Sequence, residues 1–285
     1  MKQRIITGAV LIVLAVLWMF YFPWYAYLAA SVLIAVLGGW EWGQFISAKA
    51  RVAYGAAILV LGGAAVALIP GLWGDVHNHY ASFGAPAAVA AVSIAALWWI
   101  LASAMVLTYP EKSAWWQSSK SLKSVFGVLT LLPFLISLVI LHTGNGDIPV
   151  LPFESDGLNL LYPMLLVWCA DSGAYFAGKN FGKHHMIPKV SPGKTVEGLA
   201  GGIVLSGIVA AAFSLSAEHS LPVLCASAAA IVFSVMGDLT ESMFKRSAGV
   251  KDSSSLLPGH GGVLDRVDSL TAALPVYLAV LSLLG

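Results

Sequence analysis

Charged residues are scarce in this sequence. They make up 10% of the 285 positions, against about 25% in typical soluble proteins. Apolar residues make up 59%, and the mean hydropathy is +0.84, which excludes a purely water-soluble fold and a disordered chain. The 15 Lys and Arg residues nearly balance the 14 Asp and Glu residues, with no long basic tract, which excludes a nucleic-acid-binding protein. The expected solvent is a lipid bilayer.

Cysteine is also scarce. Both cysteines, Cys169 and Cys225, lie inside apolar runs, where a thiol is usually a small buried hydrophobe. We therefore expect neither a disulfide bond nor a cysteine-ligated metal. The stretch Ile5–Phe22 follows Lys2 and Arg4 but lacks the small-residue cleavage site of a secretory signal. We expect it to be retained as a first membrane span.

Long apolar runs, in contrast, fill the chain. A helix needs about 20 predominantly apolar residues to cross the hydrocarbon core, and these runs are apolar on every face rather than alternating as in a β-barrel. We predict an all-α, polytopic membrane protein with about nine transmembrane helices. Residues 1–150 would form about five spans and residues 151–285 about four. The predicted spans are Ile5–Phe22, Trp24–Gly43, Val52–Ile69, Ala85–Leu107, Val125–Leu141, Leu160–Ala177, Leu199–Leu215, Leu221–Asp238 and Asp268–Leu284.

The basic residues are distributed unevenly among the predicted loops. All 15 fall at the N-terminus or in alternate loops on one side. The loops Gly71–Gly84, Thr143–Asn159 and Ala217–Ser220 carry only acidic charge. Because short loops rich in Lys and Arg stay in the cytoplasm, we predict that the N-terminus lies inside and the C-terminus outside.

Two inner segments, Gly178–Gly198 and Leu239–Val267, are longer than a helix connection needs. Loops of that length in a compact bundle are usually functional. The glycines within the predicted helices, such as Gly55, Gly62 and Gly63, indicate close helix packing.

Ionisable residues inside apolar spans are costly and indicate functional sites. Asp171 lies near the inner end of the sixth predicted span, and Asp238 lies at the inner end of the eighth. If the helix continues past Asp238, then Glu241, Ser242 and Lys245 follow at i+3, i+4 and i+7 and share one face with it.

The loop before the last span ends in His260-Gly261-Gly262, with Asp265 and Asp268 spaced i, i+3 after it. Small residues beside a helix N-terminus let backbone N–H groups approach an anion. Four cations accompany these acids: Lys245, Arg246, Lys251 and Arg266. The combination indicates a magnesium-bridged polyphosphate.

Mg²⁺ is held by one or two carboxylates together with substrate phosphates and waters. Asp238 and Asp265, both at the membrane face, suit that role. The alternative is that these charges only pair with one another and anchor the helix ends at the headgroups.

The other long inner segment contains Gly193-Lys194-Thr195. It is not a P-loop, because Pro188 stands where the earlier glycine is required and no strand precedes it. A basic loop with a Lys-Thr pair next to a helix start suits nucleotide phosphates or lipid headgroups. Purely electrostatic anchoring remains an equal alternative.

Residues 242–268 match, without a gap, the pattern S-x-x-K-R-x4-K-D-x5-P-x-H-G-G-x-x-D-R-x-D. This pattern resembles the phosphatidate cytidylyltransferase family, also called CDP-diacylglycerol synthase. Asp171-Ser-Gly-Ala-Tyr-Phe and Ser191-Pro-x-Lys-Thr-x-Glu-Gly also resemble that family. The resemblance covers roughly residues 160 to 285, and the first 150 residues match only as hydrophobic spans.

The resemblance implies that phosphatidic acid and CTP react, with Mg²⁺, to give CDP-diacylglycerol and pyrophosphate. It implies a homodimer in the bacterial inner membrane, with the active site facing the cytoplasm. Metal ligands would be Asp238 and Asp265, and nearby acids leave room for a second cation. The implied catalytic residues are Asp238, Ser242, Lys245, Arg246, Asp265, Arg266 and Asp268. The implied substrate-binding residues are Asp171, Lys194, Thr195, Lys251, Asp252, His260, Gly261 and Gly262.

Two other functions are compatible with parts of the pattern. A CTP-dependent lipid kinase would use a similar metal site but transfer the γ-phosphoryl group to a polyprenol or phytol hydroxyl. An ion-coupled transporter would place ionisable residues near mid-membrane in both halves of the chain. Here they gather at one face of the C-terminal half, which favours the enzyme.

Overall fold

The structure, a computed structural model, describes the backbone of residues 2–67, 86–143, 157–214 and 220–284. In these residues, eight helices are long and apolar enough to cross a membrane, and Thr7–Phe20 is a shorter apolar stretch. The predicted all-α, polytopic class is confirmed. The elements are α1 Lys2–Phe20, α2 Trp24–Ile46, η1 Ala48–Ala50, α3 Arg51–Ala67, α4 Pro86–Leu107, α5 Ala114–Gln117, α6 Lys120–Thr143, α7 Leu158–Phe181, β1 His185–Ile187, β2 Ser191–Thr195, α8 Val196–Ser214, α9 Ser220–Ser247 and α10 Leu264–Leu284.

Each of the nine predicted spans coincides with a helix, although the helix ends differ. The largest difference is in α9, which continues nine residues past Asp238 to Ser247. The helical face predicted for Asp238 to Lys245 is therefore present. Of the predicted outer loops, residues 71–84, 144–156 and 217–219 lie outside the described residues, as do the side chains of Lys2 and Arg4.

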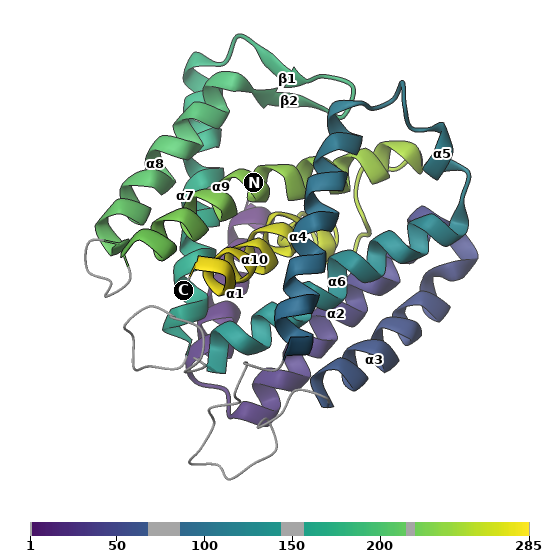
Figure 1. Cartoon of the computed structure of the whole chain (residues 1–285). Coiled ribbons are helices and arrows are strands. Elements are labelled where there is room, and N and C mark those ends of the chain that lie inside the picture. Colours follow the sequence, from purple (N-terminus) through teal and green to yellow (C-terminus); the bar gives the residue numbers. More distant parts are fainter. Residues whose placement is uncertain (1, 68–85, 144–156, 215–219, 285) are drawn as a thin grey trace.

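Helix α10 lies at the centre of the bundle (Figure 1), in contact with α9, α4, α6 and α7. It is apolar on all sides between Leu270 and Leu281, and most of its side chains there are buried. A helix that is hydrophobic all round is stable only when neighbours cover it. This central position makes α10 a fixed support for the residues at its N-terminus.

Helices α7 and α8 pack with their backbones in contact. A Cβ added to Gly173 would lie 2.5 Å from the Gly201 carbonyl oxygen, and one added to Gly202 would lie 2.6 Å from the Ala170 carbonyl oxygen. Only glycine permits this approach. The two helices form a closely packed wall, and Asp171 lies on α7.

The predicted close packing of glycines in the N-terminal half is confirmed at two positions. A Cβ on Gly55 would meet the Trp40 Cβ at 3.2 Å, and one on Gly62 would meet Leu135 Cδ2 at 2.9 Å. The prediction for Gly63 is wrong, because a Cβ there meets nothing within 4 Å.

Strands β1 and β2 form an antiparallel hairpin that the sequence did not predict. Its turn is held from two sides: the Lys189 ammonium pairs with Glu111 in the segment after α4, and Arg246 Nε donates to the Val190 carbonyl oxygen at 3.3 Å. The hydrogen bond from Lys189 lowers the pKa of Glu111. Three basic segments from distant parts of the sequence therefore meet at one end of the bundle.

Candidate active site

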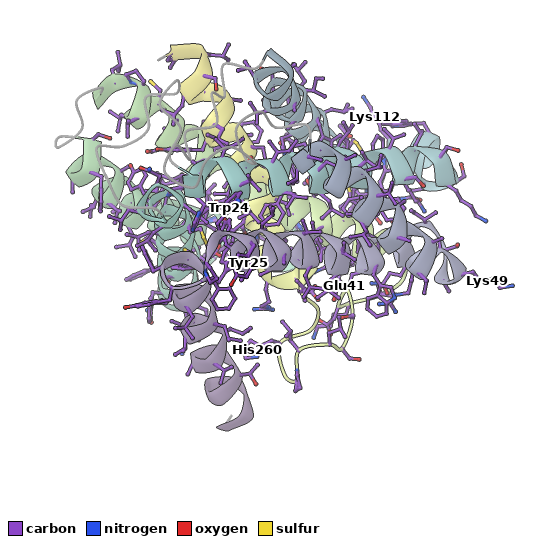
Figure 2. The ribbon with its side chains drawn as sticks, turned by 90° about the horizontal axis from the view of Figure 1, so that it is seen from below. Trp24, Tyr25, Glu41, Lys49, Lys112 and His260 are labelled. Atoms are coloured by element: carbon purple, nitrogen blue, oxygen red, sulfur yellow. The ribbon has the colours of Figure 1, made fainter. Side chains whose placement is uncertain are left out.

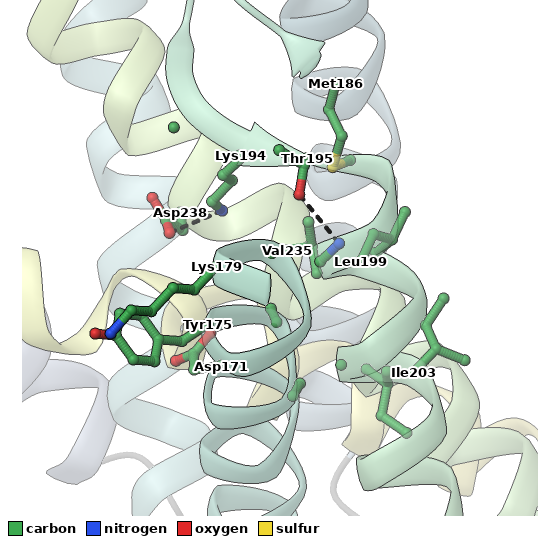
Figure 3. A pocket seen from close by; sticks show the side chains of 17 residues that line it. Asp171, Tyr175, Lys179, Met186, Lys194, Thr195, Leu199, Ile203, Val235 and Asp238 are labelled. Carbon is green, nitrogen blue, oxygen red and sulfur yellow. Dashed lines mark hydrogen bonds and ion pairs between the residues drawn. The ribbon is translucent and has the colours of Figure 1, made fainter. Parts of the chain in front are cut away.

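A cleft of about 470 Å³ lies between α7, α8 and α9, beneath the β1–β2 hairpin (Figure 3). Lys194, Thr195 and Asp238 lie near the hairpin, whereas Asp171 lies further from it along α7, and apolar side chains line most of the part between the helices. The polar lining includes Asp171, Lys179, Lys194, Thr195 and Asp238, and the apolar lining includes Ala170, Ile203, Ile231 and Val235. One cavity thus offers a charged end and an apolar end.

An ion pair crosses the charged end of the cleft. Lys194 Nζ, on β2, lies 2.7 Å from Asp238 Oδ2, on α9, and both side chains are partly exposed, at 26% and 30%. The Ser242 hydroxyl, one turn further along α9, donates to Asp238 Oδ1 at 3.2 Å. Asp171 on α7 is exposed and lies in electrostatic range of Asp238, Lys194 and Arg266.

Thr195 links the hairpin to α8. Its hydroxyl oxygen accepts a hydrogen bond from the Gly198 N–H at 3.1 Å, so Thr195 caps the N-terminus of α8. A Cβ on Gly178 or Gly198 would press against the same hydroxyl, at 3.2 Å and 3.1 Å. The cap fixes Thr195 and its neighbour Lys194 at the edge of the cleft.

A second charged group is buried behind the cleft. Lys245 Nζ donates to Glu241 Oε2 at 2.5 Å and to Asp265 Oδ1 at 2.6 Å, and these three side chains are 9% exposed or less. Asp265 Oδ2 accepts three further bonds at 2.8 Å, from the Ser253 N–H, the Ser253 hydroxyl and the Gly262 N–H. The Asp265 carboxylate therefore holds the loop to the helices, and metal binding by it stays a prediction.

Asp268 lies between the two charged groups. Its carboxylate is in electrostatic range of Asp238, Glu241 and Lys245, and its Oδ1 accepts the Ser269 N–H at 2.8 Å. Within the described residues, no three His, Cys, Asp or Glu side chains converge on a point where a metal could sit. Two carboxylates on one cleft still suit Mg²⁺, because this ion takes substrate phosphates and waters as its other ligands.

A family model described as "Cytidylyltransferase family" matches residues 2–284. The chain belongs to the cytidylyltransferase family. Two similar proteins, each named phosphatidate cytidylyltransferase, come from Haemophilus influenzae and Pseudomonas aeruginosa. They are 38% and 42% identical to this chain, over 97% and 99% of its length and 97% of their own. A protein of the same name from Bacillus subtilis is 46% identical over 127 residues, which is 44% of this chain and 47% of that protein.

Membership in the cytidylyltransferase family confirms the resemblance and extends it. The sequence motifs covered only the C-terminal half, whereas the family match includes the N-terminal helices. Those helices are therefore part of the family's shared architecture rather than a hydrophobic addition.

The other residues predicted from the family motif lie outside the cleft lining. Lys251, Asp252, Arg246 and Arg266 are exposed around the loop before α10. His260 faces α1 instead: Gly8 of that helix lies close to His260 Nε2, and Thr7 Oγ1 donates to the Pro258 carbonyl oxygen at 3.3 Å.

Gly261 and Gly262 have conformational and steric reasons to be glycine. Gly261 has φ +81°, a left-handed backbone conformation. A Cβ on Gly262 would collide with Ser253 Oγ and Glu41 Oε1. Substrate contacts by these two residues stay predictions.

Sequence reasoning missed three residues. Lys179 and Tyr175 line the cleft, with the Lys179 ammonium 5.8 Å from the Tyr175 ring centre. Glu41 in α2 is fully buried and touches the loop before α10. The rule that ionisable residues in spans indicate function, applied to the second span, would have found Glu41.

Proposed function

We propose that the chain transfers the cytidylyl group of CTP to phosphatidic acid and releases pyrophosphate, giving CDP-diacylglycerol. The cleft carries this proposal. Its charged end suits the phosphates of a nucleotide and of a lipid, and its apolar end, between membrane helices, suits the acyl part of the lipid. The names of the two full-length relatives agree with this substrate pair.

The chemistry requires one bond to form and one to break. A phosphate oxygen of phosphatidic acid attacks the α-phosphorus of CTP, and the bond between that phosphorus and the oxygen bridging to the β-phosphorus breaks. The leaving group departs as pyrophosphate. No enzyme nucleophile is needed, so positioning and charge neutralisation supply the catalysis.

Lys194 and Lys179 are the cations of the cleft that suit the triphosphate. Lys194 pairs with Asp238 in the structure, and a triphosphate competes for the same ammonium. Movement of Lys194 onto phosphate frees Asp238 Oδ2. The pair therefore keeps the charged end of the cleft neutral until nucleotide arrives.

For Mg²⁺ we propose Asp238 as a ligand, with Asp171 as a second carboxylate on the same cleft. A bound Mg²⁺ would neutralise charge on the triphosphate as pyrophosphate leaves. Asp265, the other predicted ligand, could join only if Lys245 or the loop donors withdrew from it. A second cation also stays a prediction.

We place the cleft at the cytoplasmic face of a bacterial inner membrane. The hairpin, the segment after α4 and the end of α9 meet at one end of the bundle and are rich in Lys and Arg, which favours the cytoplasmic side. Water-soluble CTP is available there. The homodimer stays a prediction, and the closely packed glycines of α7 and α8 are engaged within the chain.

The test uses purified protein in detergent with phosphatidic acid, Mg²⁺ and CTP labelled with ³²P at either the α or the γ position. We expect α-label in the organic phase, dependent on both substrates and lost with EDTA. Label that reaches lipid only from the γ position, with a polyprenol or phytol as acceptor, would instead establish a lipid kinase.

A further inference from the structure

Glu41 is a buried acid in the N-terminal half of the chain. It lies on α2 in Gly-Gly-Trp-Glu-Trp-Gly and is 0% exposed. It does not line the cleft. Figure 2 shows it on α2 beside the loop that precedes α10. A carboxyl group at such depth needs hydrogen-bond partners, because removal of a polar group from water is costly.

Four donors surround the Glu41 carboxylate. Oε1 accepts from the Ser254 hydroxyl at 2.5 Å and from the Val263 N–H at 2.9 Å. Oε2 accepts from the Leu264 N–H at 2.6 Å, and the Ser253 hydroxyl, whose single proton it shares with Asp265, lies 3.1 Å away. Among the described residues, no Lys or Arg forms an ion pair with it.

The two backbone donors lie at the N-terminus of α10. The first N–H groups of a helix have no partner within it, and the helix dipole makes this end favourable for a negative charge. Glu41 therefore caps α10 from another helix, across more than 200 positions of sequence. The cap joins the N-terminal half directly to the loop of the family motif.

Ser253 connects this cap to the buried ion pair. Its hydroxyl lies 3.1 Å from Glu41 Oε2 and 2.8 Å from Asp265 Oδ2, and its N–H donates to the same Asp265 oxygen. Gln44, one turn after Glu41, donates to the Ser253 carbonyl oxygen. Every polar group of Ser253 is thus held by α2 or by Asp265, and Asp265 in turn holds Lys245.

We infer that Glu41 is a positioning residue for the transfer reaction. Its carboxylate fixes the loop of residues 253–264 and the first turn of α10, and through Ser253 it sets the place of Asp265 beside α9. The kinetic consequence rests on the proposed cytidylyl transfer, whereas the effect on the loop does not. The role requires both oxygens of the side chain to accept hydrogen bonds. Gln offers one oxygen and one NH2 group, so it cannot replace Glu41.

The test compares Glu41→Gln with a matched control, Ser31→Ala. Ser31 is equally buried on α2, and its hydroxyl donates to the Tyr27 carbonyl oxygen of the same helix at 2.8 Å. Two readouts are made on folded protein selected by size-exclusion chromatography. One is amide hydrogen exchange by peptide, and the other is kcat and KM for CTP per folded molecule.

For Glu41→Gln we expect faster exchange confined to residues 251–266 and a fall in kcat of roughly 10-fold to 100-fold, as for a small misplacement of reacting groups. Ser31→Ala should match the unmodified chain in both readouts. If Glu41→Gln yields no folded protein, Ser254→Ala, which removes one donor, carries the same test, with a smaller change expected in the same residues.

Two results would overturn the inference. One is unchanged exchange in the loop. The other is faster exchange spread evenly over the chain with kcat per folded molecule unchanged, which is the behaviour of a residue that only stabilises the fold. If the unmodified chain makes no CDP-diacylglycerol, the proposed function fails, but the exchange comparison still decides whether Glu41 orders the loop.

Discussion

Two ion pairs lie within two turns of α9 and differ in their exposure to solvent. The Lys194–Asp238 pair lines the cleft with both side chains more than a quarter exposed, whereas the Lys245–Asp265 pair is 9% and 4% exposed. Solvent-exposed pairs are weak and exchange their partners readily, but a buried pair is costly to break. The Lys194–Asp238 pair is therefore suited to separate when substrate binds. The Lys245–Asp265 pair is suited to hold the loop and α10 in place during substrate binding.

Removal of Lys245 should have the largest effect on stability. Lys245→Met leaves Glu241 and Asp265 buried without their cation, which typically costs about 3–5 kcal/mol. Thermal unfolding in detergent measures the loss, with Lys120→Met, at an exposed position at the start of α6, as the control. An unchanged melting temperature would show that this pair does not hold the structure.

Removal of the Asp238 charge should lower turnover rather than stability. Asp238→Asn keeps the side chain's shape but weakens the proposed metal site, and we expect kcat/KM to fall by about 10²- to 10³-fold with little change in melting temperature. Titration of Mg²⁺ in the activity assay is the measurement. Near-normal activity at saturating Mg²⁺ would remove Asp238 from the proposed ligands.

Lys194→Met should have a smaller effect, because Lys179 remains in the cleft. We expect KM for CTP to rise roughly tenfold, as for loss of one partly screened charged hydrogen bond, with stability nearly unchanged. Steady-state kinetics at several CTP concentrations measure this. A large loss of stability without a change in KM would show that Lys194 stabilises the fold and does not bind nucleotide. The two ion pairs would then not differ in role.

The smallest effect is expected at the Lys189–Glu111 pair, which is exposed on both sides. Glu111→Gln should change activity by no more than about twofold. Because the pKa of Glu111 is lowered, the pair stabilises the hairpin at neutral pH and loses this effect as pH falls below the ordinary range of a glutamate. Hydrogen exchange of residues 185–195 at neutral and at acidic pH measures this stabilisation of the hairpin. Equal protection of the hairpin in Glu111→Gln and in the unmodified chain at neutral pH would contradict the prediction.

The helices and the charged face of α9 were predictable because they depend on local patterns. A run of apolar residues sets each span, and the spacing of Asp238, Glu241, Ser242 and Lys245 sets their common face. Family membership was predictable from residues 242–268. These features need no knowledge of which helices touch.

The contacts that could not be predicted from the sequence join distant segments. Glu41 meets Ser253 across 212 positions, and Lys189 meets Glu111 across 78. The hairpin was missed because its two short strands carry no alternating pattern, and its turn is held by Arg246 and Glu111 from outside. The position of His260 beside α1, rather than at the cleft, likewise follows from tertiary packing.

The most direct test of where nucleotide binds is photocrosslinking with a reactive CTP analogue in the presence of Mg²⁺, followed by peptide mapping. We expect crosslinks in α7 near residues 171–179 and in residues 193–199, competed by unlabelled CTP and reduced in Lys194→Met. Crosslinks confined to residues 251–262, with none in the hairpin or α7, would contradict the assignment of the cleft as the nucleotide site.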